Sequence, residues 1–95
     1  MIVERWEHRI KAGHLEEAID LLLSFKWVRP FRAYRARVGV LHRLVIDVEY
    51  ENMADIEKAW EEIESTSGYE SFLKKWQSVI ISTERTFLSP VETSR

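Results

Sequence analysis

The first ten residues alternate between two faces, which is the period of a β-strand. One face carries Ile2, Glu4, Trp6, His8 and Ile10. The other face carries Val3, Arg5, Glu7 and Arg9. From residue 14 the apolar residues are spaced three and four apart, which predicts an amphipathic helix that ends before Pro30. The apolar stripe of this helix is Leu15, Ala18, Ile19, Leu22 and Phe25.

The middle of the chain predicts two strands on either side of Gly39, over residues 31–38 and 40–50. One face of the second strand carries His42, Leu44, Ile46, Val48 and Tyr50. The other face carries Arg43, Val45, Asp47 and Glu49. A second helix follows, with Asn52 as its N-cap and Asp55 three residues further on. The apolar stripe of the second helix is Ile56, Ala59, Trp60 and Ile63.

The last third of the chain predicts a short helical piece and a final strand. Ser67 and Gly68 interrupt the second helix. The piece that follows carries Tyr69, Phe72, Leu73 and Trp76. Residues 79–88 are rich in β-branched side chains, which favour a strand. The order β-α-β-β-α-β predicts an α+β, ferredoxin-like fold, with one four-stranded antiparallel sheet and two helices on one face.

Length and composition indicate one small globular domain. The chain has 95 residues, of which 45% are apolar and 32% charged, as is typical of folded proteins. We expect residues 1–90 to form the domain and residues 91–95 to form a frayed tail. The absence of cysteine excludes disulfides, cysteine-ligated metal sites and a thiol nucleophile.

Charge and hydropathy narrow the set of partners. The formal net charge is −2, which gives no field that would attract nucleic acid. No apolar run is long enough for a membrane span or a signal peptide. We therefore expect a cytoplasmic protein with neither a nucleic acid nor a membrane as its partner.

The sheet face without helices combines charges of both signs with two valines. Arg5, Glu7 and Arg9 join Arg43, Asp47 and Glu49 there, beside Val3 and Val45. One interpretation is a solvated face of mixed charge. The other is a two-fold interface, because a self-complementary patch needs both signs on one surface. A short chain also gains stability from the additional buried area of a homodimer.

Several stretches of the chain follow a known pattern. They are MIVE (1–4), RIKAGHLEE (9–17), GVLHRLV (39–45), EYENMAD (49–55), AW (59–60) and FLKKW (72–76). Over about residues 1 to 90 the chain resembles the dimeric α+β barrel proteins, and within them the NIPSNAP-like and antibiotic-biosynthesis-monooxygenase-like groups. The NIPSNAP-like pattern has a Lys-Pro-Gly turn where this chain has Ala12 in place of the proline. The resemblance implies the fold and a homodimer, but the superfamily mixes monooxygenases, haem-degrading enzymes, isomerases and proteins of unknown role.

Aromatic side chains on the helix-covered side of the sheet have two possible roles. The chain contains 4 tryptophans, and these can fill the core or form the wall of a pocket between the sheet and the helices. Ligand-binding members of the superfamily hold their ligands in that pocket. The residues that we assign to a candidate ligand site are Glu4, Trp6, His8, Tyr34, His42, Trp60, Phe72 and Trp76.

His8 and His42 are the candidates for catalysis, because both are predicted on the helix-covered face of neighbouring strands. Each can be a hydrogen-bonded core residue, or can orient a ligand carbonyl and exchange a proton in a pocket. Glu4 on the same face needs a partner if it is buried, and His8, Tyr34 or Tyr50 can supply one. The spacing of Glu4 and the two histidines is not diagnostic of a metal site. We expect no metal and no cofactor.

Four arginines, Arg29, Arg32, Arg35 and Arg37, lie in and before a strand that this topology places at the edge of the sheet. Positive charge on an edge strand discourages aggregation. The alternatives are an anion clamp at the mouth of the pocket and salt bridges to a second subunit.

Two classes of function stay open. The first is a protein that binds an apolar ligand with a polar head, fatty-acid-like or polyketide-like, in the cleft between sheet and helices. The second is a cofactor-independent monooxygenase or isomerase acting on an enolisable aromatic or polyketide-like substrate. In an enzyme, Trp60 and Trp76 would pack the substrate, and His8 or His42 would take the proton. Binding is favoured, because no motif singles out a catalytic base.

Overall fold

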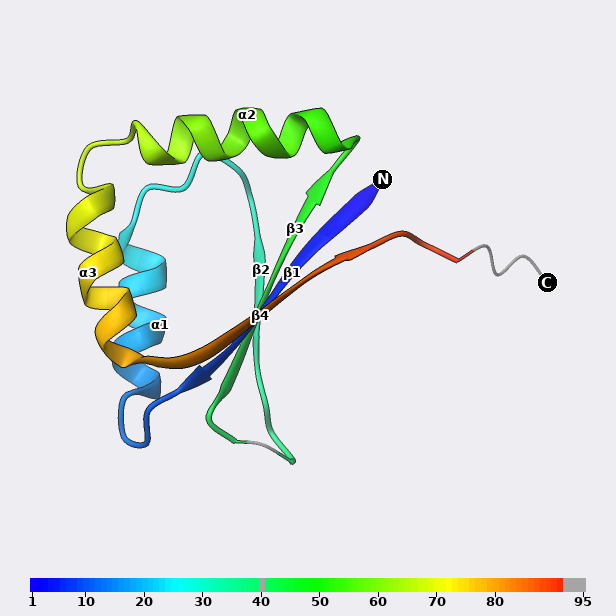
Figure 1. Ribbon diagram of the computed structural model, residues 1–95. Helices are drawn as coiled ribbons and strands as arrows, with labels where there is room; N and C mark the ends of the chain where they lie inside the picture. The colour runs from blue at the N-terminus through cyan, green and yellow to red at the C-terminus, as the bar shows by residue number, and fades with distance from the viewer. Residues whose placement is uncertain (40, 92–95) are drawn as a thin grey trace.

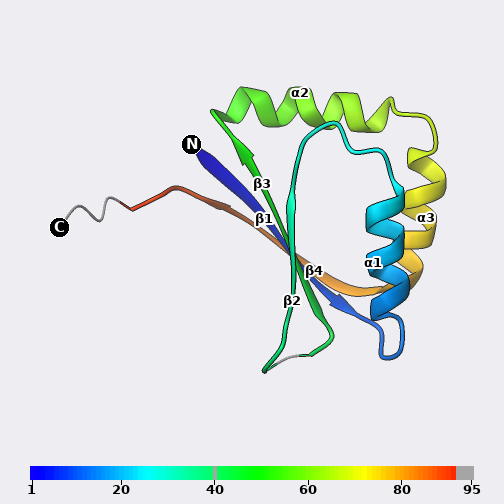
Figure 2. The ribbon, with the colours of Figure 1, turned by 180° about the vertical axis from the view of Figure 1, so that it is seen from behind.

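A four-stranded antiparallel sheet carries the described helices on one of its faces (Figures 1 and 2). The computed structural model describes residues 1–39 and 41–91. The elements in chain order are β1 (Ile2–Ile10), α1 (Leu15–Ser24), β2 (Arg32–Arg35), β3 (Arg43–Tyr50), α2 (Met53–Glu64), α3 (Tyr69–Val79) and β4 (Ile80–Leu88). The strand order is β2-β3-β1-β4, so that β1 and β3 are central. The predicted α+β, ferredoxin-like class is confirmed.

The register of the sheet explains which side chains of the two central strands are buried. Trp6 lies opposite Ile46, and His8 lies opposite Leu44. Side chains on one face of these strands lie under the helices, as the alternation in the sequence predicts. The buried members are Glu4, His8, Ile10, Leu44, Ile46 and Tyr50.

The apolar core consists of two clusters rather than one. The larger cluster lies between the sheet and helices α1 and α3, and its buried residues are Ile10, Ala18, Leu22, Leu44, Ile46, Phe72, Trp76 and Val79. The smaller cluster lies under α2 and contains Tyr50, Ile56 and Ala59. Because two clusters form, the region between them can hold a cavity.

The ends of α2 and α3 fix how these helices lie over the sheet. Asn52 caps α2 as predicted, since its side-chain oxygen accepts a hydrogen bond of 3.1 Å from the backbone N–H of Asp55. Gly68 has a φ of 88°, a left-handed conformation that glycine adopts without steric cost. The chain turns there, and α3 runs at a steep angle to α2 (Figure 1). The sequence predicted only a short helical piece, whereas α3 is a helix of 11 residues.

The β2–β3 hairpin differs most from the prediction. The strands expected over residues 31–38 and 40–50 are shorter, and Val40 lies outside the described residues. Because β1 ends at Ile10, the tip of the hairpin projects beyond the central strand (Figure 1). Val38 at this tip is 91% exposed.

The open face of the sheet carries the mixed charges that the sequence predicted. The Arg5 guanidinium donates two hydrogen bonds, of 2.8 and 2.9 Å, to the Asp47 carboxylate. Arg43 lies 3.4 Å from Glu7. Both pairs join β1 to β3, so part of the charge on this face is neutralised within one chain.

The chain after β4 is described only as far as Val91. The frayed tail that we expected over residues 91–95 therefore lies, apart from its first residue, outside the described part of the chain. Within residues 1–39 and 41–91, no helix combines the length and the apolar character that crossing a bilayer requires.

Candidate ligand-binding cavity

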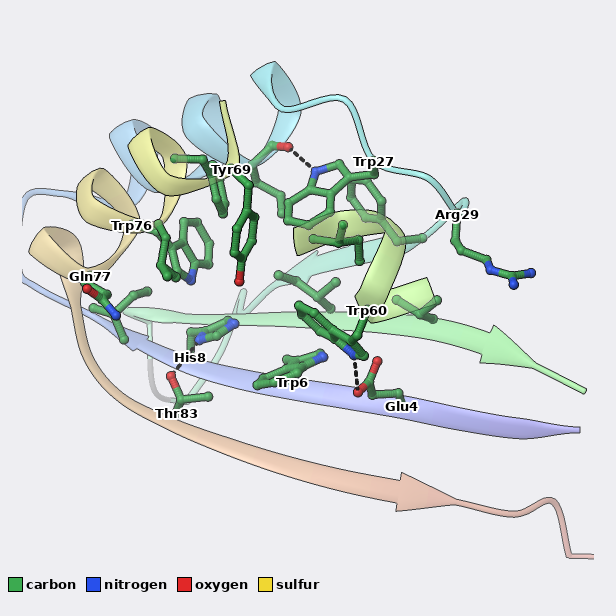
Figure 3. Close-up of a pocket in the computed structure, with 18 of the residues that line it drawn as sticks. Glu4, Trp6, His8, Trp27, Arg29, Trp60, Tyr69, Trp76, Gln77 and Thr83 are labelled. Carbon is green, nitrogen blue, oxygen red and sulfur yellow. Dashed lines mark hydrogen bonds between the residues drawn. The ribbon is translucent and has the colours of Figure 1, made fainter. Parts of the chain in front are cut away.

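A cavity of about 420 Å³ lies between the sheet and the helices, lined by residues of both core clusters (Figure 3). This volume is within the range of pockets that bind small molecules. The aromatic lining residues are Trp6, Trp27, Phe31, Tyr50, Trp60, Tyr69, Phe72 and Trp76. They come from β1, β3, α2, α3 and the connection between α1 and β2. The wall is therefore assembled from segments that are far apart in the sequence.

The aromatic rings pack against one another as well as against the cavity. Trp60 faces the sheet, as its position on the apolar stripe predicted, and its ring centroid lies 5.7 Å from that of Trp6. Phe72 and Trp76 stack with their centroids 5.5 Å apart. The ring of Trp27 lies edge-on to Phe72 at 5.2 Å. The two roles proposed for these residues are thus combined, because the same rings fill the core and line the cavity.

Glu4 is a fully buried carboxylate on the central strand β1. It accepts hydrogen bonds from the Tyr50 hydroxyl at 3.2 Å and from the Trp60 indole Nε1–H at 3.3 Å. The Arg85 guanidinium donates two more, from Nε at 2.8 Å and from a terminal nitrogen at 2.5 Å. Burial of the carboxylate is therefore compensated by both charge and hydrogen bonds. Of the three partners proposed for Glu4, only Tyr50 makes this contact.

Arg85 was not recognised from the sequence. It lies opposite Trp6 in the pairing of β1 with β4. Its guanidinium carbon lies 4.8 Å from the centroid of Trp6 and 4.7 Å from that of Phe87, so the cation is held between two rings. The alternation of β4 could have placed Arg85 on the helix-covered face, but only after the register with β1 was known.

His8 is buried with one ring nitrogen engaged. Its Nδ1 lies 2.9 Å from the Thr83 hydroxyl. Its ring stacks with Trp6 at 6.1 Å and meets the Trp76 ring edge-on at 5.1 Å. Burial lowers the pKa of His8 to about 4, so the imidazole is neutral at pH 7. The described hydrogen bonds leave Nε2 free, and this nitrogen lies on the cavity side of the ring (Figure 3).

Two residues of the predicted site lie elsewhere, and their assignment to the cavity wall is wrong. His42 is exposed, because β3 begins only at Arg43 and His42 belongs to the preceding turn. Tyr34 is 48% exposed. It pairs with Val45, so its side chain lies on the open face of the sheet. His8 and His42 therefore do not converge on one cavity.

The remaining six predicted residues do line the cavity, namely Glu4, Trp6, His8, Trp60, Phe72 and Trp76. That they bind a ligand stays a prediction. Polar lining residues that the predicted site omitted are Arg29, Tyr50, Tyr69, Gln77 and Thr83.

Two of these omitted residues could donate hydrogen bonds to a ligand. The Tyr69 hydroxyl points into the cavity (Figure 3). Burial, and to a lesser extent the negative charge of Glu64, raise the pKa of Tyr69, so the hydroxyl keeps its proton. Arg29 lies at the opposite end of the cavity from Gln77 (Figure 3). Its guanidinium carbon is 5.8 Å from the centroid of the Tyr50 ring.

Glu4 and His8 both line the cavity, whereas His42, the third residue weighed in the sequence for a metal site, is exposed. Within the described residues no group of three or more histidine, cysteine, aspartate or glutamate side chains is placed to hold an ion. Glu4 is instead bound by Arg85 and aromatic donors.

Comparison with known proteins assigns the chain to a family. The NIPSNAP family model matches residues 2–95. No curated protein matches the chain.

Solved structures with the same fold include NIPSNAP proteins and candidate antibiotic biosynthesis monooxygenases. An uncharacterised NIPSNAP domain protein from Burkholderia xenovorans is 19% identical, with a TM-score of 0.87 over 100% of this chain and 99% of that one. A NIPSNAP family protein from Agrobacterium tumefaciens is also 19% identical, with a TM-score of 0.86 over 98% and 88% of the two chains. A candidate antibiotic biosynthesis monooxygenase from Deinococcus radiodurans is 10% identical, with a TM-score of 0.70 over 100% and 97%. At these identities the likeness concerns the fold alone.

Proposed function

The chain belongs to the NIPSNAP family, and because a fold does not by itself determine an activity, we propose a function from the cavity. We infer that the protein binds an elongated apolar ligand with one polar head, of a fatty-acid-like or polyketide-like kind. The observation that carries this proposal is the aromatic cavity of about 420 Å³ with a few polar groups along its wall.

The size and lining of the cavity support a ligand of this kind. One water molecule occupies about 30 Å³ in the liquid, so the cavity has room for roughly a dozen heavy atoms. Burying ten methylene groups would contribute about 8 kcal/mol before the costs of association. Micromolar affinity would then require no strong polar contact.

The polar groups of the cavity divide into those already engaged and those available to a ligand. The Glu4 carboxylate is occupied by Arg85, Trp60 and Tyr50. The described hydrogen bonds leave the His8 Nε2 and the Tyr69 hydroxyl free on the cavity side (Figure 3). A ligand could therefore use these two neutral groups without displacing an existing contact.

A titration monitored by tryptophan fluorescence tests the proposal, since several tryptophans line the cavity. The probes are decanoate and a long-chain alkyl phenyl ketone, as representatives of the two ligand kinds. Leu73→Phe places a larger side chain in the cavity wall and should weaken binding. Leu23→Phe is the matched control, because Leu23 is exposed on α1. A saturable change that Leu73→Phe weakens supports the proposal, and no saturable change with either probe contradicts it.

The alternative function, a cofactor-independent monooxygenase or isomerase, has weaker support from the geometry. It requires a base, and His42 lies outside the cavity. His8 lines the cavity, but a pKa of about 4 makes its imidazole a weak proton acceptor at neutral pH. The position of His8 therefore fits hydrogen bonding to a ligand better than abstraction of a proton from carbon.

We also propose that the protein is a homodimer that pairs through the open face of the sheet. In support, no described helix covers this face, and Val3, Tyr34 and Val45 contribute apolar surface to it. The pairing of Arg5 with Asp47 neutralises two charges that would otherwise be costly to bury. A stable interface would bury about 1,200 Å² or more in total.

A further inference from the structure

The cavity has two ends of different electrostatic character. At one end, His8 lies between Trp6 and Trp76, and burial keeps its imidazole neutral. At the other end lies Arg29, in the connection between α1 and β2, with its guanidinium directed outwards beyond the aromatic wall (Figure 3). A ligand with unequal ends should therefore have one preferred orientation.

Arg29 lines the cavity, and Arg85 contacts two lining residues, Glu4 and Trp6, but the two arginines differ in their charged partners. The Arg85 guanidinium is bound to the Glu4 carboxylate at 2.8 Å. For Arg29, the described ion pairs include no carboxylate within 4.0 Å. Arg29 instead lies over the face of the Tyr50 ring, which holds its guanidinium at the rim. Its hydrogen-bond donors are consequently available to an anion.

Arg29 also borders a second hollow, whose acidic side chains limit the charge of an anion that can bind there. This hollow is lined by Met1, Arg29, Glu49, Tyr50, Glu51 and Asp55. Three acidic side chains close to the rim would repel a phosphate dianion more strongly than a singly charged carboxylate. The charge of Glu4 does not cancel the attraction of Arg29, because Arg85 compensates it.

Building on the proposed function, we infer that the ligand is an amphiphilic monocarboxylate whose head group binds Arg29 at the rim of the cavity. A planar guanidinium matches a carboxylate with two parallel hydrogen bonds. The apolar body runs inwards over Trp27, Trp60 and Phe72 towards the neutral His8 end. A carboxylate at the His8 end would lack a positive partner there.

Three probes with the same ten-carbon chain separate the head group from the chain: decanoate, decanol and decyl phosphate. Binding is measured by tryptophan fluorescence and by calorimetry on the full chain. Two variants are compared with the original protein. Arg29→Gln removes the charge at the rim. Arg32→Gln is the matched control, because Arg32 is exposed on the edge strand β2 and does not line the cavity.

We expect the original protein to bind decanoate about tenfold more tightly than decanol and than decyl phosphate. Arg29→Gln should lose this preference while it still binds decanol, and Arg32→Gln should keep the preference. Unfolding in urea shows whether each variant is folded. A variant that still binds decanol is folded in any case.

Equal affinity for decanoate and decanol in the original protein would overturn the inference but leave the proposed apolar site intact. Persistence of the preference in Arg29→Gln, or a preference for decyl phosphate, would also overturn it. Failure of every probe to bind would overturn both the inference and the proposed function.

Discussion

The Arg85 guanidinium closes over the Glu4 carboxylate, with 2.8 Å between Nε and Oε2. Glu4 is fully buried on the central strand β1, whereas the Arg85 side chain, on the edge strand β4, is 39% exposed. The pair therefore places an acid in the interior and neutralises it from the edge of the sheet. The same acid binds Trp60 and Tyr50, so one carboxylate joins β1, β3, β4 and α2.

Removal of Arg85 should destabilise the protein by leaving a buried carboxylate without its cation. We expect Arg85→Met to lower the free energy of unfolding by about 2 kcal/mol, less than for a fully buried pair because water reaches the arginine. Glu4→Gln added to Arg85→Met should recover part of this loss, since the amide carries no charge. Urea unfolding of the original protein and of the two variants measures both effects. A double variant that is less stable than Arg85→Met alone would contradict this account of the pair.

The stability of the protein should depend on pH through His8. Its folded-state pKa of about 4 lies below the value of about 6.5 expected for the unfolded chain. Below about pH 6.5 the unfolded state therefore binds a proton that the folded state does not, and stability falls as the pH decreases towards 4. We expect His8 to account for a loss of about 2 kcal/mol between pH 7.5 and 5.0.

The His8 contribution can be separated from that of the carboxylates by comparing two variants. His8→Gln should show a smaller decrease in unfolding free energy between pH 7.5 and 5.0 than the original protein. His42→Gln is the matched control, because His42 is exposed in the turn before β3. The unfolding free energy of this variant should decrease between pH 7.5 and 5.0 as much as that of the original protein. If the unfolding free energy of both variants decreases as much as that of the original protein, the burial of a neutral His8 does not cause the decrease.

Trp60 and Trp76 should respond differently to truncation. Trp76 is 8% exposed and belongs to the larger core cluster, so Trp76→Ala should cost about 3–5 kcal/mol. Trp60 is only partly buried and borders the cavity, so Trp60→Ala should cost clearly less. Trp60→Phe keeps an aromatic ring but removes the indole N–H that donates to Glu4. The unfolding free energy lost in this variant reports on the hydrogen bond of 3.3 Å. Equal losses for the two alanine variants in urea unfolding would argue against an open cavity beside Trp60.

The proposed homodimer predicts about twice the chain mass in size-exclusion chromatography with light scattering at micromolar concentration. Val45→Asp introduces a charge on the open face, opposite Tyr34 and Glu7 in the sheet, and should yield a monomer. Leu23→Asp adds the same charge on an exposed position of α1 and should leave the dimer intact. A monomeric original protein would exclude the dimer at that concentration.

The burial pattern of the central strands could be predicted from the sequence because it depends on local alternation. Glu4 and His8 fall on the helix-covered face of β1 in both the prediction and the structure. The same reasoning failed for His42, since alternation does not show where a strand begins. β3 begins at Arg43, so His42 lies in the preceding turn, where alternation along a strand no longer determines which way a side chain points.

The side chains that contact the cavity residues could not be predicted, because these contacts depend on the register between strands that are distant in the sequence. Glu4 was recognised as a residue that needs a partner, but Arg85 is separated from it by 81 positions. The register that brings them together also contains an irregularity between Arg9 and Ile10. Arg29 and Trp27 come from a connection without periodicity, so no pattern could place them at the cavity.

The contact between Glu4 and Arg85 also has a consequence for the order of events during synthesis. Glu4 is made among the first residues of this sequence, and its cation follows 81 positions later. The strand β4 that carries this cation also completes the pairing of β1 on one side. While the chain is being made, the carboxylate can therefore stay in water, and burying it becomes favourable only when β4 is available. β1 can consequently reach its final environment only after β4 has been made, so the sheet is completed as a unit rather than strand by strand from β1.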